Sequence, residues 1–372
     1  MLSTLAADRA CKAELETQIL ALERSIAGTA LQLEKTAVQE RLNYYKYPVL
    51  TLPTEIICEI FIRFIPIYPL CPPFFGPLSP TVLTHICRKW RDIALATSEL
   101  WRAISLSKIR EPFDPRDIWL SASSRLPISI SIRGERGDRS CEVQLFAAVL
   151  PYHTRWEYLT LHLRGTYILP AIEGEMPLLR HLNLDLEELD EVAVFHGVPL
   201  LRTAILKFGA IWGVILPWTQ LTSLTLHGRP LETCVEILRR TPNLVHCTLD
   251  LAICGHESRI PDVVLPYLES FRCTDEWDNC YIPGCLMAII VPSLRSLQIS
   301  EYLIRPDPVD FLDAFISKSG CNLHWQELGI LGQRDGHKDS YCKAFPSVRR
   351  IFFSGRYEGS SGESSEAESS DV

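Results

Sequence analysis

The residues that could support metal chemistry are concentrated in one short stretch of the sequence. Thiol and carboxyl side chains lie close together there, with His256 nearby: Cys273, Asp275, Glu276, Asp278, Cys280 and Cys285. Such groups bind zinc and iron, so one hypothesis is an enzyme that uses a metal at this stretch. Their spacing matches no structural zinc pattern, and an acidic loop explains them more simply. We therefore expect neither a metal nor another cofactor.

Motifs of other catalytic classes are also missing. The sequence contains no glycine-rich phosphate loop and no His-Glu-x-x-His. It has no nucleophile elbow either, because the GSSG run at 359–362 follows no strand that could strain its serine. The sequence therefore favours a binding protein over an enzyme.

Composition excludes further classes of function. The chain has 372 residues and a net charge of −8, so no positive field attracts nucleic acid or anionic lipid. Thirteen scattered cysteines without a Cys-x-x-Cys pair predict reduced thiols. The uncharged run at 64–84 is long enough to span a membrane, but its prolines predict a loop. Because the N-terminus does not resemble a secretory signal, we expect an intracellular protein of the cytoplasm, the nucleus or both, without membrane contact.

Two helical regions begin the chain. Residues 1–46 carry an apolar heptad seam that decays after two heptads, which favours an amphipathic helix over a coiled coil. Residues 47–106 predict two or three short helices around a small core, among them TEIICEIFIRF and an amphipathic helix of about four turns from Val82. The first of these is apolar nearly all round, apart from a stripe of Glu55, Glu59 and Arg63. A helix of this kind needs a cover on almost every side.

The third region, from about 107 to 355, is an array of repeats. The unit is a proline followed by L-x-x-L-x-L, as in MPLLRHLNL and VPSLRSLQI, and its first apolar position recurs at 156, 179, 201, 221, 244, 268, 294, 325 and 348. This period is typical of one strand and one return segment per repeat, stacked so that the leucines bury against the next repeat. We therefore expect an α/β fold with an irregular leucine-rich-repeat solenoid that begins with a strand at 126–132.

The residues between the repeat leucines should form a polar concave wall. They point away from the core because side chains alternate along a strand. The wall is mixed in sign, which suits a protein or peptide partner and not nucleic acid. We take the following wall residues as candidate substrate contacts: His181, Asn183, Asp185, Lys207, Thr225, His227, Asp250, Arg272 and Gln298. Residues 356–372, rich in Ser and Glu, should be disordered.

Residues 49–106 resemble the F-box. LTLPTEIICEIF contains its Leu-Pro-x-Glu-Ile and Ile-Phe elements, HICRKW contains Cys-Arg-x-Trp, and SELW contains the closing Leu-Trp. An F-box followed by leucine-rich repeats is also the order found in that family. The heptad helix before YPVLTLP resembles the F-box proteins that are numerous in mushroom-forming fungi.

The resemblance implies the substrate-recognition subunit of a Skp-cullin-F-box ubiquitin ligase. The F-box would dock on a Skp-type adaptor, and through it on a cullin, while the repeats hold an unknown protein substrate. Such a subunit works by raising local concentration and needs no catalytic residue. The adaptor contacts implied by the family are Leu52, Pro53, Glu55, Ile56, Ile60 and Phe61, whereas Ile86, Cys87, Trp90 and Trp101 would hold the motif together. Because the link at 66–80 is longer than usual, the alternative is a leucine-rich-repeat scaffold outside any ligase.

Overall fold

The computed structural model describes residues 2–22, 28–44, 51–106, 116–134, 145–167, 174–189, 192–195, 197–252, 260–275, 285–321, 327–332 and 338–354. Within these ranges the fold is mixed α/β. The chain forms two compact units, one of Met1–Phe64 with Leu83–Thr97 and the other of Ile65–Val82 with Ser98–Val372. Residues 65–82 and 98–106 thus group with the repeats, and not with the helices of the predicted domain 47–106. The predicted tail at 356–372 lies outside the described residues.

The N-terminal helical region is a hairpin of two helices. Helix α1 spans Leu2–Leu22 and helix α2 spans Gly28–Tyr44. Arg41 is 3.4 Å from Asp8, and Lys35 is 3.8 Å from Glu16, so the helices run antiparallel. The hairpin buries a small apolar seam: Leu5, Leu15, Ile19 and Val38. The prediction of one continuous helix was therefore wrong, because the apolar seam is covered within the hairpin itself.

Three further helices follow in the predicted F-box-like region. Helix α3 spans Thr54–Phe64, α4 spans Thr81–Thr84 and α5 spans Arg88–Ala96. Helix α3 packs on α5 through Phe61 and Trp90, whose rings meet edge to face at 4.9 Å. The prediction of one four-turn helix from Val82 was wrong, because Cys87 adopts an extended conformation and begins a new helix.

The second unit is built on an eleven-stranded sheet in which every neighbouring pair is parallel. Strand order follows the chain, so each repeat adds one strand beside the last. The strands are β1 (Ala103–Leu106), β2 (Ile128–Arg133), β3 (Trp156–Tyr167), β4 (His181–Leu189), β6 (Thr203–Phe208), β8 (Ser223–Arg229), β9 (His246–Leu251), β11 (Ser270–Asp275), β13 (Ser296–Ser300), β14 (Glu327–Leu331) and β15 (Arg350–Ser354). Strand β1 was not predicted, and it places the start of the array before the strand at 126–132.

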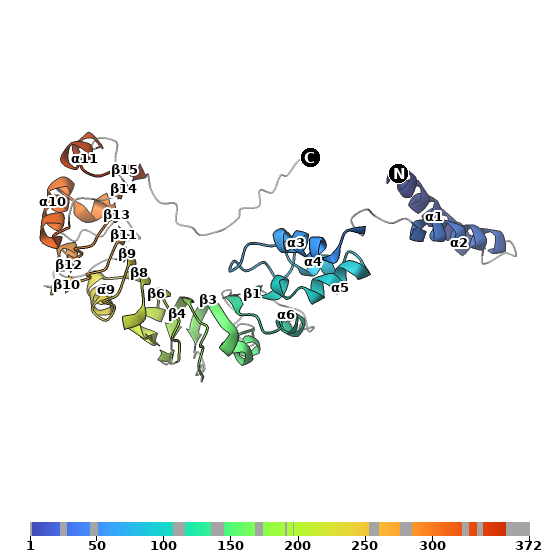
Figure 1. The fold of residues 1–372 in the computed structure, drawn as a ribbon, viewed down its shortest axis with the longest axis horizontal. Coiled ribbons are helices and arrows are strands. Elements are labelled where there is room, and N and C mark those ends of the chain that lie inside the picture. Colours follow the sequence, from blue (N-terminus) through green and yellow to red (C-terminus); the bar gives the residue numbers. More distant parts are fainter. Residues whose placement is uncertain are drawn as a thin grey trace. The chain divides into compact units, whose positions relative to one another are not determined.

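Short helices and two small strand pairs connect the main strands. The pairs are β5 (Ala193–Val194) with β7 (Val214–Ile215), and β10 (Val263–Val264) with β12 (Ile289–Ile290). The helices are η2 (Ser98–Trp101), α6 (Arg116–Ala122), η3 (Leu150–Arg155), α8 (Ala210–Gly213), η4 (Trp218–Gln220), α9 (Leu231–Leu238), η5 (Cys285–Ala288), η6 (Glu301–Ile304), α10 (Pro308–Ser319) and α11 (Lys338–Ala344). Within this unit the strands lie side by side along an arc, and α9 and α10 lie on its outer side (Figure 1).

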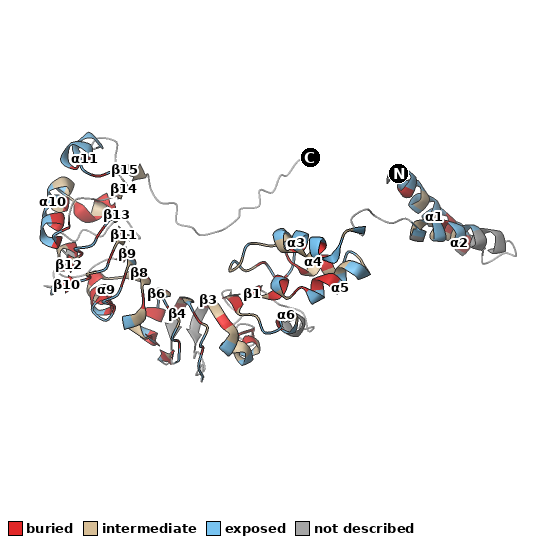
Figure 2. Ribbon diagram, in the orientation of Figure 1, coloured by how far each residue is buried: buried red, intermediate tan, exposed pale blue. Residues whose placement is uncertain are grey.

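The repeat leucines form the core between the sheet and these helices. Strand register aligns Leu182 with Ala204 and then with Leu224. Leu184, Leu206 and Leu226 form the next aligned row, and all three are fully buried. Buried and partly exposed residues alternate along the strands, as Figure 2 shows by colour. The period-2 pattern therefore sends the leucines to one face of the sheet and the polar residues to the other.

The proline-rich segment Ile65–Val82 packs against the first strands of the sheet. The amide of Ser105 in β1 donates to the carbonyl of Pro72 at 3.1 Å, and Pro73 forms a parallel bridge with Ser105. Phe74 stacks on Trp119 of α6, with ring centroids 5.3 Å apart. The segment therefore occupies the outer edge of β1, where an earlier repeat would otherwise have to lie.

Candidate functional site

Helix α3 exposes an apolar stripe beside its buried face. Ile57 and Phe61, four residues apart, are buried, whereas Ile56 and Ile60 are 48 % and 44 % exposed. Residues four apart share one helix face, so the two pairs form adjacent stripes. Pro53 is exposed, Leu52 is half-buried, and Glu55 is exposed on the same short helix. Most of the predicted adaptor contacts therefore lie at the surface of the first unit.

Phe61 is the exception among these predicted contacts. Its side chain is 1 % exposed and meets the ring of Trp90, so it belongs to the core of α3 and α5 and not to a docking surface. Ile86, expected to hold the motif together, is instead 55 % exposed in the turn between α4 and α5. A helix that is apolar nearly all round does not reveal in its sequence which face is buried.

The second candidate surface is the polar face of the sheet. Strand register sorts its side chains into three rows that run across the strands. Row one is Ser129, Tyr158, His181, Thr203, Ser223, His246, Ser270, Ser296, Glu327 and Arg350. Row two is Ser131, Thr160, Asn183, Ile205, Thr225, Thr248, Arg272, Gln298, Gly329 and Phe352. Row three is Arg133, His162, Asp185, Lys207, His227, Asp250 and Thr274.

All of the predicted substrate contacts lie on this face, but only some lie together. Asp185, Lys207, His227 and Asp250 are neighbours in row three. Arg272 and Gln298 lie on β11 and β13, farther along row two. At about 4.8 Å per strand, Gln298 is roughly 24 Å from β4. A partner that contacts the whole set must therefore be extended or large.

Row three is held by hydrogen bonds and one ion pair between neighbouring strands. His162 Nδ1 lies 3.2 Å from Asp185 Oδ2, and Lys207 Nζ lies 3.6 Å from the same oxygen. On the other side of Lys207, His227 Nδ1 lies 3.2 Å from Asp250 Oδ2, and Thr274 donates to Asp250 Oδ1 at 3.1 Å. These side chains are partly exposed, so row three forms a line of fixed charge at the surface.

Rows one and two are mostly uncharged between β3 and β9. His181 lies beside Tyr158, with ring centroids 5.9 Å apart, and burial lowers the pKa of this imidazole. The carbonyl oxygen of Asn183 is buried without a hydrogen-bond partner among the described residues. The hydroxyl, amide and imidazole groups of these rows suit hydrogen bonding, whereas the Asp and Lys side chains in this part of the face lie in row three.

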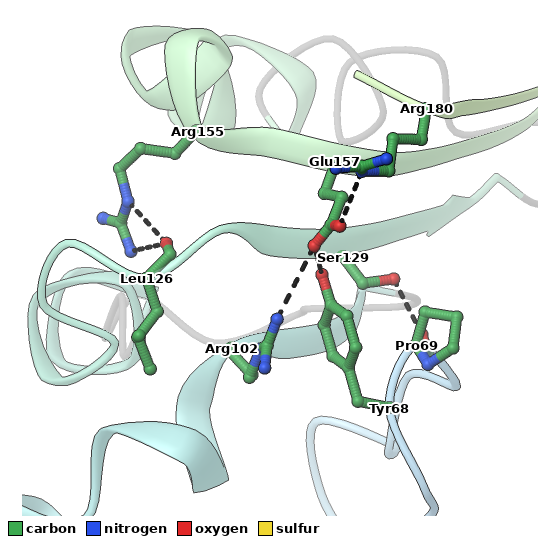
Figure 3. A network of polar contacts seen from close by, with 8 residues as sticks. All are labelled: Tyr68, Pro69, Arg102, Leu126, Ser129, Arg155, Glu157 and Arg180. Atoms are coloured by element: carbon green, nitrogen blue, oxygen red, sulfur yellow. Dashed lines mark hydrogen bonds and ion pairs between the residues drawn. The ribbon is translucent and has the colours of Figure 1, made fainter. Parts of the chain in front are cut away.

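An ion network fixes the end of the polar face nearest β1 (Figure 3). Tyr68 donates a hydrogen bond of 2.7 Å to Glu157, and Arg102 and Arg180 lie 3.6 Å and 3.2 Å from the same carboxylate. Burial, and then the hydrogen bond to Glu157, raise the pKa of Tyr68 well above its usual value. The guanidinium of Arg102 also stacks on the Tyr68 ring, 3.6 Å from its centroid. The network ties the segment Ile65–Val82 to β3.

Sequence reasoning missed Arg133 and Tyr68 as parts of this face. Arg133 ends the strand ISISIR at the register position of His162, so counting alternate residues back through β2 would have found it. Tyr68 had no comparable signal, because its partner Glu157 lies 89 residues later in the chain. A contact between such distant residues follows from the fold and not from any local pattern.

The cysteine and acidic residues weighed as a hypothetical metal site are only partly described. Cys273 is buried in the sheet core, where burial raises the pKa of its thiol, and Asp275 ends β11. Glu276, Asp278, Cys280 and His256 lie outside the described residues, as does the side chain of Cys285. Within the described ranges, no three His, Cys, Asp or Glu side chains are placed to hold a metal ion.

None of the described helices combines the length and the apolar composition needed to cross a bilayer. Neither the models of known protein families nor the curated protein sequences gave a match to this chain.

Proposed function

We propose that this chain is the substrate-recognition subunit of a Skp-cullin-F-box ubiquitin ligase. The observation that carries the proposal is the exposed stripe of α3, with Ile56 and Ile60 at the surface beside Pro53. Apolar side chains exposed in a row on a short helix are typical of a surface that a partner covers. Their positions coincide with the contacts that the F-box resemblance implies, so the partner is a Skp-type adaptor.

The sheet unit supplies the substrate-binding part of the proposal. We interpret it as an irregular leucine-rich-repeat solenoid that holds a protein substrate on its polar face. In support of this, one parallel strand is added per repeat, and the repeat leucines are buried in aligned rows. A receptor of this kind brings a substrate close to the ubiquitin-charged enzyme and contributes no catalytic group itself.

The docking proposal can be tested by removing the exposed isoleucines. We expect the full chain to co-purify with a Skp-type adaptor, and the double variant Ile56→Ala with Ile60→Ala to bind it about a hundredfold more weakly. This loss is expected because burial of each side chain is worth about 1.5 kcal/mol. Both residues are half-exposed, so their truncation should leave the melting temperature nearly unchanged. Isothermal titration measures the affinity.

A matched control removes equally exposed apolar side chains from the other unit. Ile215→Ala with Val264→Ala, which are 51 % and 53 % exposed, should leave adaptor binding unchanged. The proposal fails if the unmodified chain binds no adaptor at micromolar concentration. It also fails if the control weakens binding as much as the α3 variant does.

The alternative is a leucine-rich-repeat scaffold that works outside any ligase. One observation favours it: the link between α3 and α4 packs on the sheet, with Pro72 bonded to Ser105. A link bound in this way belongs to the unit that contains the sheet, and not to the helices that would dock on an adaptor. Binding of the adaptor without recruitment of a cullin, measured by co-purification of all three chains, would favour the scaffold.

A further inference from the structure

Row three of the polar face repeats one triplet of side chains. From β2 to β9, across consecutive strands, register places Arg133 beside His162 and His162 beside Asp185, and then Lys207 beside His227 and His227 beside Asp250. The order cation, imidazole, carboxylate therefore occurs twice. At about 4.8 Å per strand, the two copies lie roughly 14 Å apart.

The surroundings of the two triplets match in several respects, although Asp185 also pairs with Lys207 at 3.6 Å, whereas Asp250 accepts a hydrogen bond from Thr274. In both, the histidine and the aspartate are 23 residues apart, and Nδ1 of the ring lies 3.2 Å from the carboxylate. In both, a threonine (Thr160 or Thr225) precedes the histidine by two residues. A second histidine (His181 or His246) precedes the aspartate by four. Cross-strand ion pairs alone stabilise a sheet, but they require neither the imidazole between the charges nor the matching neighbours.

Each triplet has the chemistry of an anion subsite. The aspartate contacts Nδ1 of the histidine, so Nε2 is the ring nitrogen that remains for a ligand. The neighbour of the histidine on the preceding strand is a cation, Arg133 or Lys207. A carboxylate bonded to Nδ1 fixes the ring orientation and offsets its charge when Nε2 takes up a proton. An anion can then accept from that Nε2–H and from Arg133 or Lys207, both charge-assisted hydrogen bonds.

The charge of row three depends on the protonation of its two histidines. With neutral imidazoles the two cations and two carboxylates balance, and each proton taken up adds one positive charge. His162 faces Arg133 from β2 and Asp185 from β4. His227 faces Lys207 from β6 and Asp250 from β9. An anion that binds beside a histidine therefore favours uptake of a proton there.

We propose that row three binds a partner segment with two anionic side chains about 14 Å apart, one at Arg133 and His162 and the other at Lys207 and His227. An extended segment rises about 3.4 Å per residue, so the anionic residues are separated by four positions. The anions are carboxylates or phosphate monoesters. The inference rests on the proposed use of the polar face for substrates, and it names the chemistry of the substrate.

The test measures binding of fluorescent peptides to the full chain by anisotropy. Peptides of Gly and Ser carry Glu at positions i and i+4, phosphoserine at the same positions, or one anion only. We expect at least one two-anion peptide to bind about tenfold or more tightly than its one-anion counterpart, because the second contact is intramolecular. The tighter of the two peptides identifies the anion.

Paired variants remove one subsite at a time. Arg133→Gln with His162→Gln, or Lys207→Gln with His227→Gln, should reduce the affinity of the two-anion peptide to that of the one-anion peptide. Glutamine retains an N–H donor for the aspartate but cannot take up a proton. The control His85→Gln with Lys343→Gln, exposed residues outside row three, should bind as the unmodified chain does.

Three results would overturn the inference. These are equal affinity of one-anion and two-anion peptides, unchanged binding by both subsite variants, and absence of binding by any anionic peptide at millimolar concentration. The first and third results are measured on the unmodified chain, so the inference can be refuted even if the variants fail to fold. Adaptor binding is measured at α3, and each proposal can therefore fail without the other.

Discussion

The two ends of the sheet are completed in different ways. At β1 the segment Ile65–Val82 pairs with the edge strand, and Phe74 stacks on the buried Trp119. At β15, the last strand of the described chain, the side chains from Ile351 to Phe353 are only half-buried. The first and last strands of a sheet each have one edge without a neighbouring strand, so each edge needs its own cover. The first end receives a cap of about one repeat's length, whereas at the last end, among the described residues, Phe353 packs against Tyr341 of α11 with ring centroids 5.9 Å apart.

Both ends nevertheless use a tyrosine bonded to a glutamate. Tyr68 donates to Glu157 at 2.7 Å within a network that includes Arg102. Tyr341 of α11 donates to Glu301 at 3.3 Å, and both residues are buried. On the polar face of the last strands the ring of Phe352 lies over Gly329, because a Cβ added at Gly329 would be 2.5 Å from that ring. The link between α3 and α4 therefore has a structural role: it covers the β1 edge of the sheet and is bonded to β3 through Tyr68 and Glu157.

The largest difference between the ends should appear on removal of their aromatic side chains. Trp119→Ala leaves a large cavity among Phe74 and Trp101, and should cost about 3–5 kcal/mol of the free energy of unfolding. Phe353→Ala should cost about half as much or less, because the ring is already partly exposed. Urea unfolding followed by circular dichroism measures both. Equal losses would contradict a better-sealed first end.

The cap and the sheet differ in how far the sequence could predict them. Alternation of leucines along each strand, combined with the repeat spacing, fixes which residues share a row, and Leu184, Leu206 and Leu226 lie in register as this requires. By contrast, β1 is only four residues long and lies next to Trp101 in a stretch that reads as the end of a helical domain. Its pairing with Pro73 arises from tertiary contact alone.

The candidate sites also contain a part that the sequence predicts and a part that it does not. The wall positions followed from the alternation, and the triplets in row three could have been found from the recurring TLH and His-x-x-x-Asp strings. The burial of Phe61 could not, because nearly every side of α3 is apolar and only packing against Trp90 selects the buried face. Local periodicity therefore predicts rows and faces, whereas choices between similar faces depend on neighbours that are remote in sequence.

The tyrosines at the two ends give a comparison of intermediate size. Tyr341→Phe removes a donor from the buried Glu301 and should cost about 1–3 kcal/mol. Tyr68→Phe should cost less, because Glu157 keeps Arg102 and Arg180. Chemical unfolding at neutral pH measures both variants. A larger loss for Tyr68→Phe would show that the first network depends on its phenol.

The same two phenols make stability depend on alkaline pH. Burial, with the nearby glutamate in each case, raises the pKa of Tyr68 and of Tyr341. Their folded pKa values lie above the unfolded value of about 10, so their contribution is complete below that pH and is lost as pH rises through the folded values. The double Tyr→Phe variant should therefore lose less stability than the unmodified chain as the pH rises above about 10.

The smallest expected difference in the free energy of unfolding is that between the loss of Arg350, in row one, and the loss of Arg180, one residue before His181 of row one. Arg350 is 3.3 Å from Glu327 at the last strand, and both side chains are well exposed, so Arg350→Ala should cost no more than about 0.5 kcal/mol. Arg180 binds Glu157, whose side chain is mostly buried, and Arg180→Ala should cost about 1 kcal/mol. Midpoints of urea unfolding resolve the two. Added salt should weaken the Arg350–Glu327 pair at the last strand more than the Arg180–Glu157 pair near β1. That result would show that the charges near β1 are less accessible to water and salt than those at the last strand.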